Sequence, residues 1–296
     1  MASISFFLPF KQKGAHYGDN DARLVTLLRT LKNCFGDLAE SKFIICSHPD
    51  DLTAAINVGT AFPGIPLDII DENELIDGIT ENKALRPWQK QQALKLSSFK
   101  RCTSEFVFFL DPDILFVERF STVDVARAGR SLISLTHAPE DSIPWWGASS
   151  SLLMMPLPKG PLFMGVTPEL LKASILSDLS EHIERIYGCR LIDALSLNAS
   201  RHWTEFTLYH TFLNTVSKIE HHHLTDSRER RLLRDESIWR NLPNPDLRLS
   251  SLLNPETRNG ICAVIQSSAF PNYADITQQV QHLLYLQQNP PARKAE

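Results

Sequence analysis

The chain has 296 residues, 43% of them hydrophobic and 22% charged, and a formal net charge of −4 at pH 7. This composition is ordinary for a soluble globular protein of one large or two small domains. A weakly acidic chain lacks the positive charge that attracts nucleic-acid phosphates, so no nucleic-acid partner is expected. The five cysteines are widely spaced without a CxxC pair, which argues against a zinc ribbon or a disulfide framework.

The N-terminal segment is apolar from the start and lacks the basic stretch of a secretory signal. No apolar run reaches the roughly 20 residues of a transmembrane helix. We therefore expect a cytoplasmic protein without a transmembrane segment, in which most cysteines are buried thiols.

Apolar strands and amphipathic helices alternate in the first third of the chain. Residues 4–10 predict the first strand, and Asn20 or Asp21 is expected to cap the helix that follows. Two further strands and a helix are predicted at residues 43–46, 67–70 and 89–99. This order predicts a doubly wound, mostly parallel α/β sheet with helices on both faces. Neither a GxGxxG nor a GxxxxGK[ST] loop is present, which disfavours dinucleotide and P-loop sites.

The next predicted strand, residues 106–110, ends in a pair of aspartates. Its sequence FVFFL is continuously apolar, as in a strand buried on both faces. Asp111 and Asp113 follow at its carboxyl end, where open α/β sheets bind ligands. Carboxylates suit Mg²⁺ or Mn²⁺, and a metal there can bridge to substrate phosphates. An ordinary strand-ending turn around Pro112 remains the alternative.

The second half of the chain is less regular. Strands are predicted at residues 131–135, 149–155 and 261–265, and a loop at 137–147. Thr167 and Pro168 are favoured at a helix cap and first position, so a helix is predicted to begin near Glu169. Two later helices are predicted to open at 202–205 and to cover 276–286.

Four motifs in this order resemble those of GT-A glycosyltransferases, and more narrowly an uncharacterised bacterial family of that superfamily. They are WQKQQ at 88–92 with Lys95-Leu96, FLDPD at 109–113, FMGVTP at 163–168 and WTEFTLY at 203–209. GT-A enzymes use nucleotide sugars, and their DxD motif follows a central strand and binds a divalent metal. The resemblance implies a single large GT-A-like, Rossmann-like domain. Its parts are a nucleotide-sugar-binding half at 1–120, an acceptor and catalytic half at 121–288 and a loose tail at 289–296.

The resemblance also implies how the metal is held. Asp113 is the expected direct ligand, and Asp111 contacts the ribose or, through water, the metal. GT-A enzymes often add a late histidine, for which residues 221–223, all histidines, are candidates. Alternate side chains of an extended chain share a face, so His221 and His223 could face one ion, and we favour His223. A surface or packing role for these histidines is the alternative.

Three polar residues share neighbouring turns of the predicted helix at 89–99. Gln89, Gln92 and Lys95 could contact a uracil, a ribose or a diphosphate, unless they form a solvated helix face. Gly165 would let a sugar or acceptor approach the backbone closely, although a plain turn explains it equally well.

Glu205 is the candidate general base, since burial near the start of a helix can raise a carboxyl pKa toward the working pH. A carboxylate that only serves the helix dipole is the alternative. Trp145, Trp146 and Trp203 offer flat faces that suit sugar rings, but aromatic residues more often fill cores.

The expected function is metal-dependent transfer of a sugar from a nucleotide diphosphate, with UDP-sugars favoured, to a glycan or other hydroxyl acceptor in bacterial glycan or surface polysaccharide synthesis. A phosphohydrolase of the haloacid dehalogenase type also uses Asp-x-Asp, but after the first strand of its domain. Here the motif follows the fourth predicted strand. A non-catalytic nucleotide- or sugar-binding module is a further alternative, and it would not need Glu205. The sequence leaves open the donor base and sugar, the acceptor, inversion or retention, and the oligomeric state.

Overall fold

The structure is a computed structural model that describes residues 2–12, 19–133, 136–137, 143–159, 163–164, 167–225, 231–234, 237–238, 260–267, 269 and 274–289. The helices are α1 (Asn20–Cys34), α2 (Leu52–Thr60), α3 (Glu72–Leu75), α4 (Pro87–Ser97), α5 (Thr122–Val125), α6 (Ile143–Leu153), α7 (Ala173–Tyr187), α8 (Leu191–Leu197), α9 (Glu205–Val216), α10 (Ile219–His222) and α12 (Ala274–Gln288). The strands are β1 (Ile4–Phe10), β2 (Lys42–Ser47), β3 (Leu67–Asp71), β4 (Phe106–Phe109), β5 (Ile114–Phe116), β6 (Ala126–Arg127), β7 (Arg130–Ile133), β8 (Thr136–His137), β9 (Phe163–Met164), β10 (Glu169–Lys172), β11 (His223–Thr225) and β12 (Cys262–Val264).

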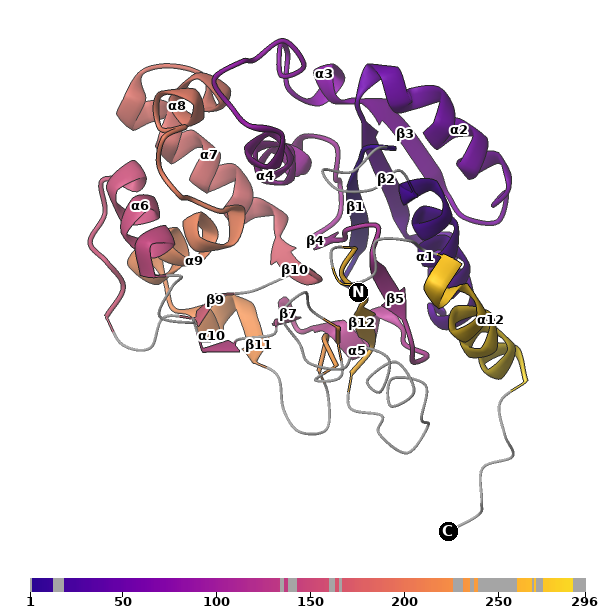
Figure 1. Ribbon diagram of the computed structural model, residues 1–296. Coiled ribbons are helices and arrows are strands. Elements are labelled where there is room, and N and C mark those ends of the chain that lie inside the picture. The colour runs from indigo at the N-terminus through magenta and orange to yellow at the C-terminus, as the bar shows by residue number, and fades with distance from the viewer. Residues whose placement is uncertain are drawn as a thin grey trace.

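A five-stranded sheet in the order β10-β4-β1-β2-β3 forms the centre of the molecule (Figure 1). β1 to β4 are parallel, and β10 pairs antiparallel with β4. The predicted α/β fold with a mostly parallel sheet is therefore confirmed. β1 is flanked by β2 on one side and by β4 on the other, so the strand order reverses between β1 and β4. Open α/β sheets bind ligands outside the carboxyl ends of the strands at such a switch point.

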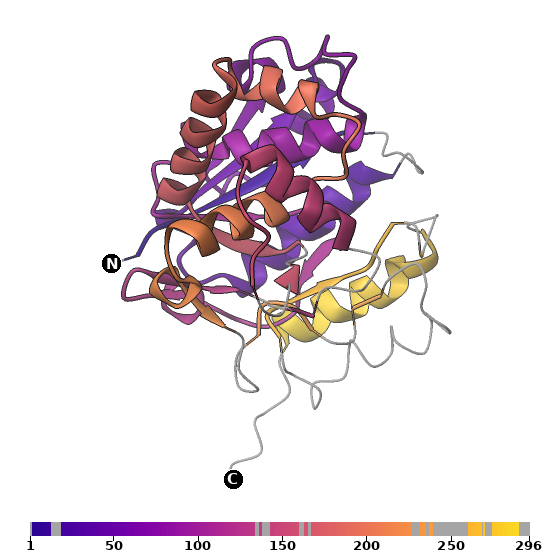
Figure 2. The same ribbon diagram turned by 90° about the vertical axis from the view of Figure 1, so that its left-hand side faces the viewer.

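Alternate residues of the central strands face two different cores. Phe7 and Phe109 contact the layer that contains α4, α7 and α9. Phe6 and Phe108 face the layer of α1 and α2, with ring centroids 5.4 Å apart. Figure 2, turned so that the first layer faces the viewer, shows its helices in front of the sheet. Burial on both faces explains why the sequence of β4 is apolar without interruption.

The predicted elements of the first third are confirmed as β1, α1, β2, β3, α4 and β4. The predicted cap of α1 is wrong, because the helix begins at Asn20 and Asp19 occupies the cap position without a side-chain cap bond. Asn20 instead donates a hydrogen bond to the carbonyl oxygen of Lys11 at 2.6 Å. This bond ties the start of α1 to the chain that leaves β1.

The predicted loop at 137–147 and strand at 149–155 are wrong, because residues 143–153 form α6. Trp146, Ser149, Ser150 and Leu153 recur at helical spacing and are buried. The small serines let α6 approach α9, where the hydroxyl oxygens of Ser149 and Thr207 lie 2.7 Å apart.

The helix predicted to begin near Glu169 is also wrong, because β10 runs from Glu169 to Lys172 and α7 begins only at Ala173. Leu170 and Leu171 are both buried, one in each core. That alternation belongs to a strand, and β4 offers the edge with which it pairs. The second half of the chain therefore supplies a strand to the sheet built by the first half.

The remaining sequence predictions agree better with the structure. β7, β12, α9 and α12 confirm four later elements. All five cysteines are free and four are buried, as expected: Cys34, Cys46, Cys102 and Cys262. Within the described ranges, none of the helices combines the length and apolar character needed to cross a membrane.

His210 on α9 gives the fold a predicted acid sensitivity. It is buried, and neither ring nitrogen has a hydrogen-bond partner within the described part of the chain. Burial lowers its pKa from 6.5 to about 4. The unfolded chain binds a proton at this histidine more readily than the folded protein does. Above pH 6.5 the need to keep the buried ring neutral therefore costs no stability. As the pH falls from 6.5 toward 4 the free energy of unfolding decreases, by about 2 kcal/mol at pH 5.

Urea unfolding at pH 7.5 and pH 5 measures this loss. Between these two pH values, the free energy of unfolding of His210→Leu should fall by about 2 kcal/mol less than that of the wild type. The exposed His202 provides the matched control, and His202→Leu should behave as the wild type does. If the free energy of unfolding fell equally in the two variants, His210 would not be the source of the acid sensitivity.

Candidate active site

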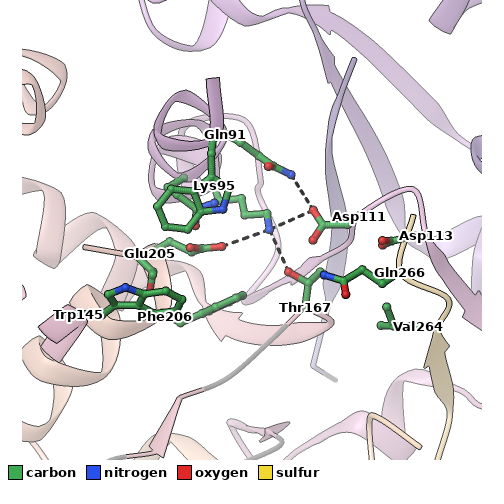
Figure 3. Close-up of a pocket in the computed structure, with 13 residues that line it drawn as sticks. Gln91, Lys95, Asp111, Asp113, Trp145, Thr167, Glu205, Phe206, Val264 and Gln266 are labelled. Atoms are coloured by element: carbon green, nitrogen blue, oxygen red, sulfur yellow. Dashed lines mark hydrogen bonds and ion pairs between the residues drawn. The ribbon is translucent and has the colours of Figure 1, made fainter. Parts of the chain in front are cut away.

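A cavity of about 300 Å³ opens beside the carboxyl end of β4, and Figure 3 shows its lining residues. They come from α4, the turn after β4, α6, the segment that precedes β10, the start of α9 and the segment around β12. The charged side chains among them are Lys95, Asp111, Asp113 and Glu205. When all four are ionised, one lysine and three carboxylates leave the cavity with a net charge of −2.

The Asp-Pro-Asp turn is held by a segment distant in sequence. β12 pairs antiparallel with β5, directly after the turn. The backbone N–H of Ile265 donates to the carbonyl oxygen of Asp113 at 2.9 Å, and that of Ser267 donates to its carboxylate at 3.3 Å. These contacts fix the carboxylate of Asp113 in the wall of the cavity.

The two aspartates suit a divalent cation. Burial, and next the negative charge of Asp111, raises the pKa of Asp113 to about 6. A cation at the pair would relieve this repulsion. Among the described residues, no group of three or more His, Cys, Asp and Glu side chains is placed to hold a metal. Mg²⁺ is usually bound through one or two carboxylates together with substrate phosphates, so a pair fits that mode of binding.

Lys95 connects the aspartates to Glu205. Its buried ammonium lies 3.2 Å from Asp111 Oδ1 and 3.2 Å from Glu205 Oε1, and it donates to Thr167 Oγ1 at 3.0 Å (Figure 3). Burial lowers the pKa of Lys95, but the two carboxylates outweigh burial and the net shift is upward. The lysine therefore stays charged and fixes the spacing between the two acidic groups.

Glu205 is the first residue of α9. Its position is set by Thr204, the N-cap, whose hydroxyl accepts a hydrogen bond from the backbone N–H of Thr207 at 3.0 Å. The side-chain amide of Gln92 lies against the carboxylate of Glu205 and, with its nitrogen turned toward it, donates to it. Burial raises the pKa of Glu205, while Lys95 opposes the rise. A fixed carboxylate with a raised pKa has the properties of a general base.

The helix α4 contributes differently from the prediction. Gln92 and Lys95 line the cavity, whereas Gln89 does not. The amide of Gln89 donates to the carbonyl oxygen of Ala199 at 2.9 Å and accepts from the backbone N–H of Arg86 at 3.2 Å. Sequence reasoning missed Gln91, which donates to Asp111 Oδ1 at 2.8 Å. Its spacing of four residues from Lys95, one helical turn, was the available signal.

Two other predicted site residues do not join this cluster. His223 is buried in β11, with its Nδ1 2.8 Å from the hydroxyl of Ser131 and its Nε2 2.8 Å from that of Tyr209. Protein groups engage both ring nitrogens, and His223 does not line the cavity that contains the aspartates. Gly165 lies outside the described residues.

A second cavity of about 330 Å³ adjoins the first, and Trp88 and Gln91 line both. It lies at the carboxyl ends of β1 and β2, where Phe10 and His48 contribute to its wall. Pro112, between the two aspartates, also lines it. Both cavities therefore border the same turn.

The buried Lys95 leads to a stability prediction. Lys95→Met leaves the carboxylates of Asp111 and Glu205 without their shared cation, so we expect a loss of about 3 kcal/mol in the free energy of unfolding. Urea unfolding at pH 7.5 measures it, and Lys100→Met, at an exposed position nearby in the chain, should change little. A Lys95→Met protein as stable as the wild type would show that the two ion pairs contribute nothing.

The fold and the site define an α/β protein whose sheet ends in an acidic cavity at the switch point between β1 and β4. The chain belongs to the family described as "Family of unknown function (DUF6492)", whose model matches residues 1–288. None of the curated proteins matches the chain.

Among the solved structures, two that are similar to this chain have low sequence identity to it. The S. aureus TarS 1-349 structure has a TM-score of 0.27 and 17% sequence identity, over 38% of this chain and 28% of that chain. Mouse xyloside xylosyltransferase 1, in its apo form, has a TM-score of 0.49 and 14% identity, over 89% of this chain and 97% of that chain. The chain thus spans little more than a quarter of the TarS chain.

Proposed function

We propose that this protein is a metal-dependent glycosyltransferase of the GT-A type, which moves a sugar from a nucleotide diphosphate to an acceptor hydroxyl. The observation that carries the proposal is the convergence of Asp111, Asp113 and the buried Glu205 in one cavity beside the carboxyl end of β4. A metal-binding pair and a candidate base on opposite sides of Lys95 provide the two groups that such a transfer requires.

The nucleotide-sugar donor occupies both adjacent cavities, with its nucleoside in one and its sugar in the other. The cavity at the ends of β1 and β2 takes the nucleoside, since its volume of about 330 Å³ falls in the range of small-molecule sites. The diphosphate lies at the shared turn, next to Asp111 and Asp113. The donor sugar then faces Glu205 across the first cavity. A UDP-sugar is the favoured donor, and a bacterial glycan is the favoured setting by the resemblance of the motifs.

A divalent ion, when bound, supplies Lewis-acid stabilisation of the departing diphosphate. Asp113 would hold the ion directly, and Asp111 is oriented by Gln91 and Lys95. Transfer with inversion forms a bond between the acceptor oxygen and the anomeric carbon while the bond from that carbon to the phosphate oxygen breaks. The proton of the acceptor hydroxyl passes to a carboxylate oxygen of Glu205. Lys95 keeps that carboxylate in place through an ion pair with its Oε1.

A thermal-shift panel tests the proposal. UDP, GDP, CDP and their sugars are each added with Mn²⁺, with Mg²⁺ or with EDTA. A ligand that binds only the folded state adds about 2.7 kcal/mol at a hundred times its dissociation constant. We expect a shift for one nucleotide that requires the metal and disappears in Asp113→Asn. No shift with any nucleotide would contradict the proposal, and release of inorganic phosphate from simple phosphate esters would favour the phosphohydrolase.

A further inference from the structure

Two tryptophans stand together where the active-site cavity meets solvent. Trp88 lies in the first turn of α4 and Trp145 in the first turn of α6, and both line the cavity. Their ring centroids are 6.3 Å apart and their planes are tilted by 45°. Trp88 is 45% exposed, whereas Trp146 and Trp203 are 1% and 0% exposed and belong to the interior. Trp145 and Glu205 line the same cavity (Figure 3).

The backbone beneath each of these indoles is anchored. Gln89, which follows Trp88, is buried and hydrogen-bonded to the carbonyl oxygen of Ala199. Trp146, which follows Trp145, is buried in the interior. The exposed ring of Trp88 and the half-buried ring of Trp145 therefore project from fixed points on two helices, which reduces the entropy that a ligand would have to overcome on binding them.

An exposed indole is a large apolar surface with a flat face, and covering it with a ligand is favourable. Around this pair, the cavity also presents the polar side chains of Gln92, Thr204 and Glu205. A pyranose ring has the matching chemistry, with C–H bonds on its faces and hydroxyl groups around its rim. A fatty acyl chain would instead need an apolar surface without these polar groups.

We propose that Trp88 and Trp145 form a platform for a sugar ring of the acceptor, so that the acceptor is a carbohydrate whose reacting hydroxyl lies beside Glu205. This inference rests on the proposed glycosyltransferase function and adds the chemical class of the second substrate. Trp88 also lines the neighbouring cavity, so stacking on the base of the donor is the competing use of the pair. The experiment below separates the two.

Two measurements are made on Trp145→Ala, Trp88→Ala and a control. The control is Tyr285→Ala, which removes a 60% exposed aromatic ring from α12, away from the cavity. The first measurement is the acceptor KM and kcat at saturating donor and Mn²⁺, with methyl α- and β-glycosides of glucose, galactose, mannose and N-acetylglucosamine as probes. The second is the calorimetric affinity for the nucleoside diphosphate with Mn²⁺. Circular dichroism and the melting temperature establish that each variant is folded.

We expect Trp145→Ala to raise the acceptor KM about tenfold, the upper range for one aromatic contact, with kcat changed less than about threefold. Trp145→Phe, which keeps a flat ring, should restore most of the loss. Tyr285→Ala should match the wild type, and the affinity for the nucleoside diphosphate should stay within about twofold in Trp145→Ala.

Three other outcomes overturn the inference. A loss of nucleoside diphosphate affinity in both tryptophan variants, with acceptor KM unchanged, would assign the pair to the donor base. Binding of donor and metal without binding or use of any glycoside would exclude a carbohydrate acceptor while leaving the proposed function intact. No binding of any nucleoside diphosphate would remove the proposed function, and this inference with it.

Discussion

Glu205→Gln is expected to lower the rate of glycosyl transfer by about 10²–10⁴-fold, the range typical for loss of a general base. The amide has nearly the same shape as the carboxylate but cannot accept the proton of the acceptor hydroxyl. Asp111 and Asp113 are unchanged, so the metal and nucleotide should still bind. Steady-state kinetics gives kcat, and calorimetry with Mn²⁺ gives the donor affinity of the same variant.

Glu220→Gln is the matched control, because Glu220 is also an acidic residue in the first turn of a helix, α10, but is exposed. If Glu205 only served the helix dipole, the two variants would differ little in rate. A Glu205→Gln enzyme with wild-type kcat would end the assignment of this residue as the base. Unchanged biological function without Glu205 would favour a non-catalytic binding module.

Asp113→Asn is expected to abolish metal-dependent nucleotide binding and yet to stabilise the metal-free protein by about 3 kcal/mol at pH 7. The pKa of Asp113 is raised from 3.8 to about 6, chiefly by burial. A carboxyl group with a raised pKa in the folded state destabilises that state above about pH 6, and the penalty disappears as the pH falls from 6 toward 3.8. Asparagine removes the charge at every pH while keeping the shape.

Urea unfolding in EDTA, at pH 7 and at pH 4, measures this effect. Asp111→Asn provides the contrast: it takes a carboxylate from Lys95 and Gln91, so it should destabilise the protein. The gain in Asp113→Asn should be larger at pH 7 than at pH 4. A metal-free Asp113→Asn protein less stable than the wild type at pH 7 would mean that the carboxylate is not under electrostatic strain.

Where one local pattern sufficed, the sequence predicted the fold well. The uninterrupted apolar run of β4 identified a strand buried on both faces, and the turn after it lies at the edge of the cavity. The segment Thr167-Pro168-Glu169 misled because its residue types favour a helix start. The structure instead has the strand β10 there, because the edge of β4 is available for pairing. Pairing with a strand about 60 residues earlier is a tertiary effect that local helix propensity does not describe.

The candidate site shows the same limit. Asp111, Asp113, Gln92, Lys95 and Glu205 were all predicted from motifs, and the structure brings them together. Their pairwise contacts were not predictable, because the ion pairs of Lys95 depend on how α4, the turn after β4 and α9 approach one another. The sequence suggested a diphosphate contact for Lys95, whereas the structure adds two carboxylates as its partners. The assigned roles stay predictions until the variants are measured.

Titration of the protein with Mn²⁺, with the free ion followed by electron paramagnetic resonance, measures whether Asp111 and Asp113 hold one divalent ion together with a nucleoside diphosphate. We expect weak binding of Mn²⁺ alone and tight binding of one ion when UDP or another matching diphosphate is present. Both should be lost in the Asp111→Asn/Asp113→Asn protein. Mn²⁺ binding that no nucleotide strengthens, or that survives in the double variant, would contradict this role of the two aspartates.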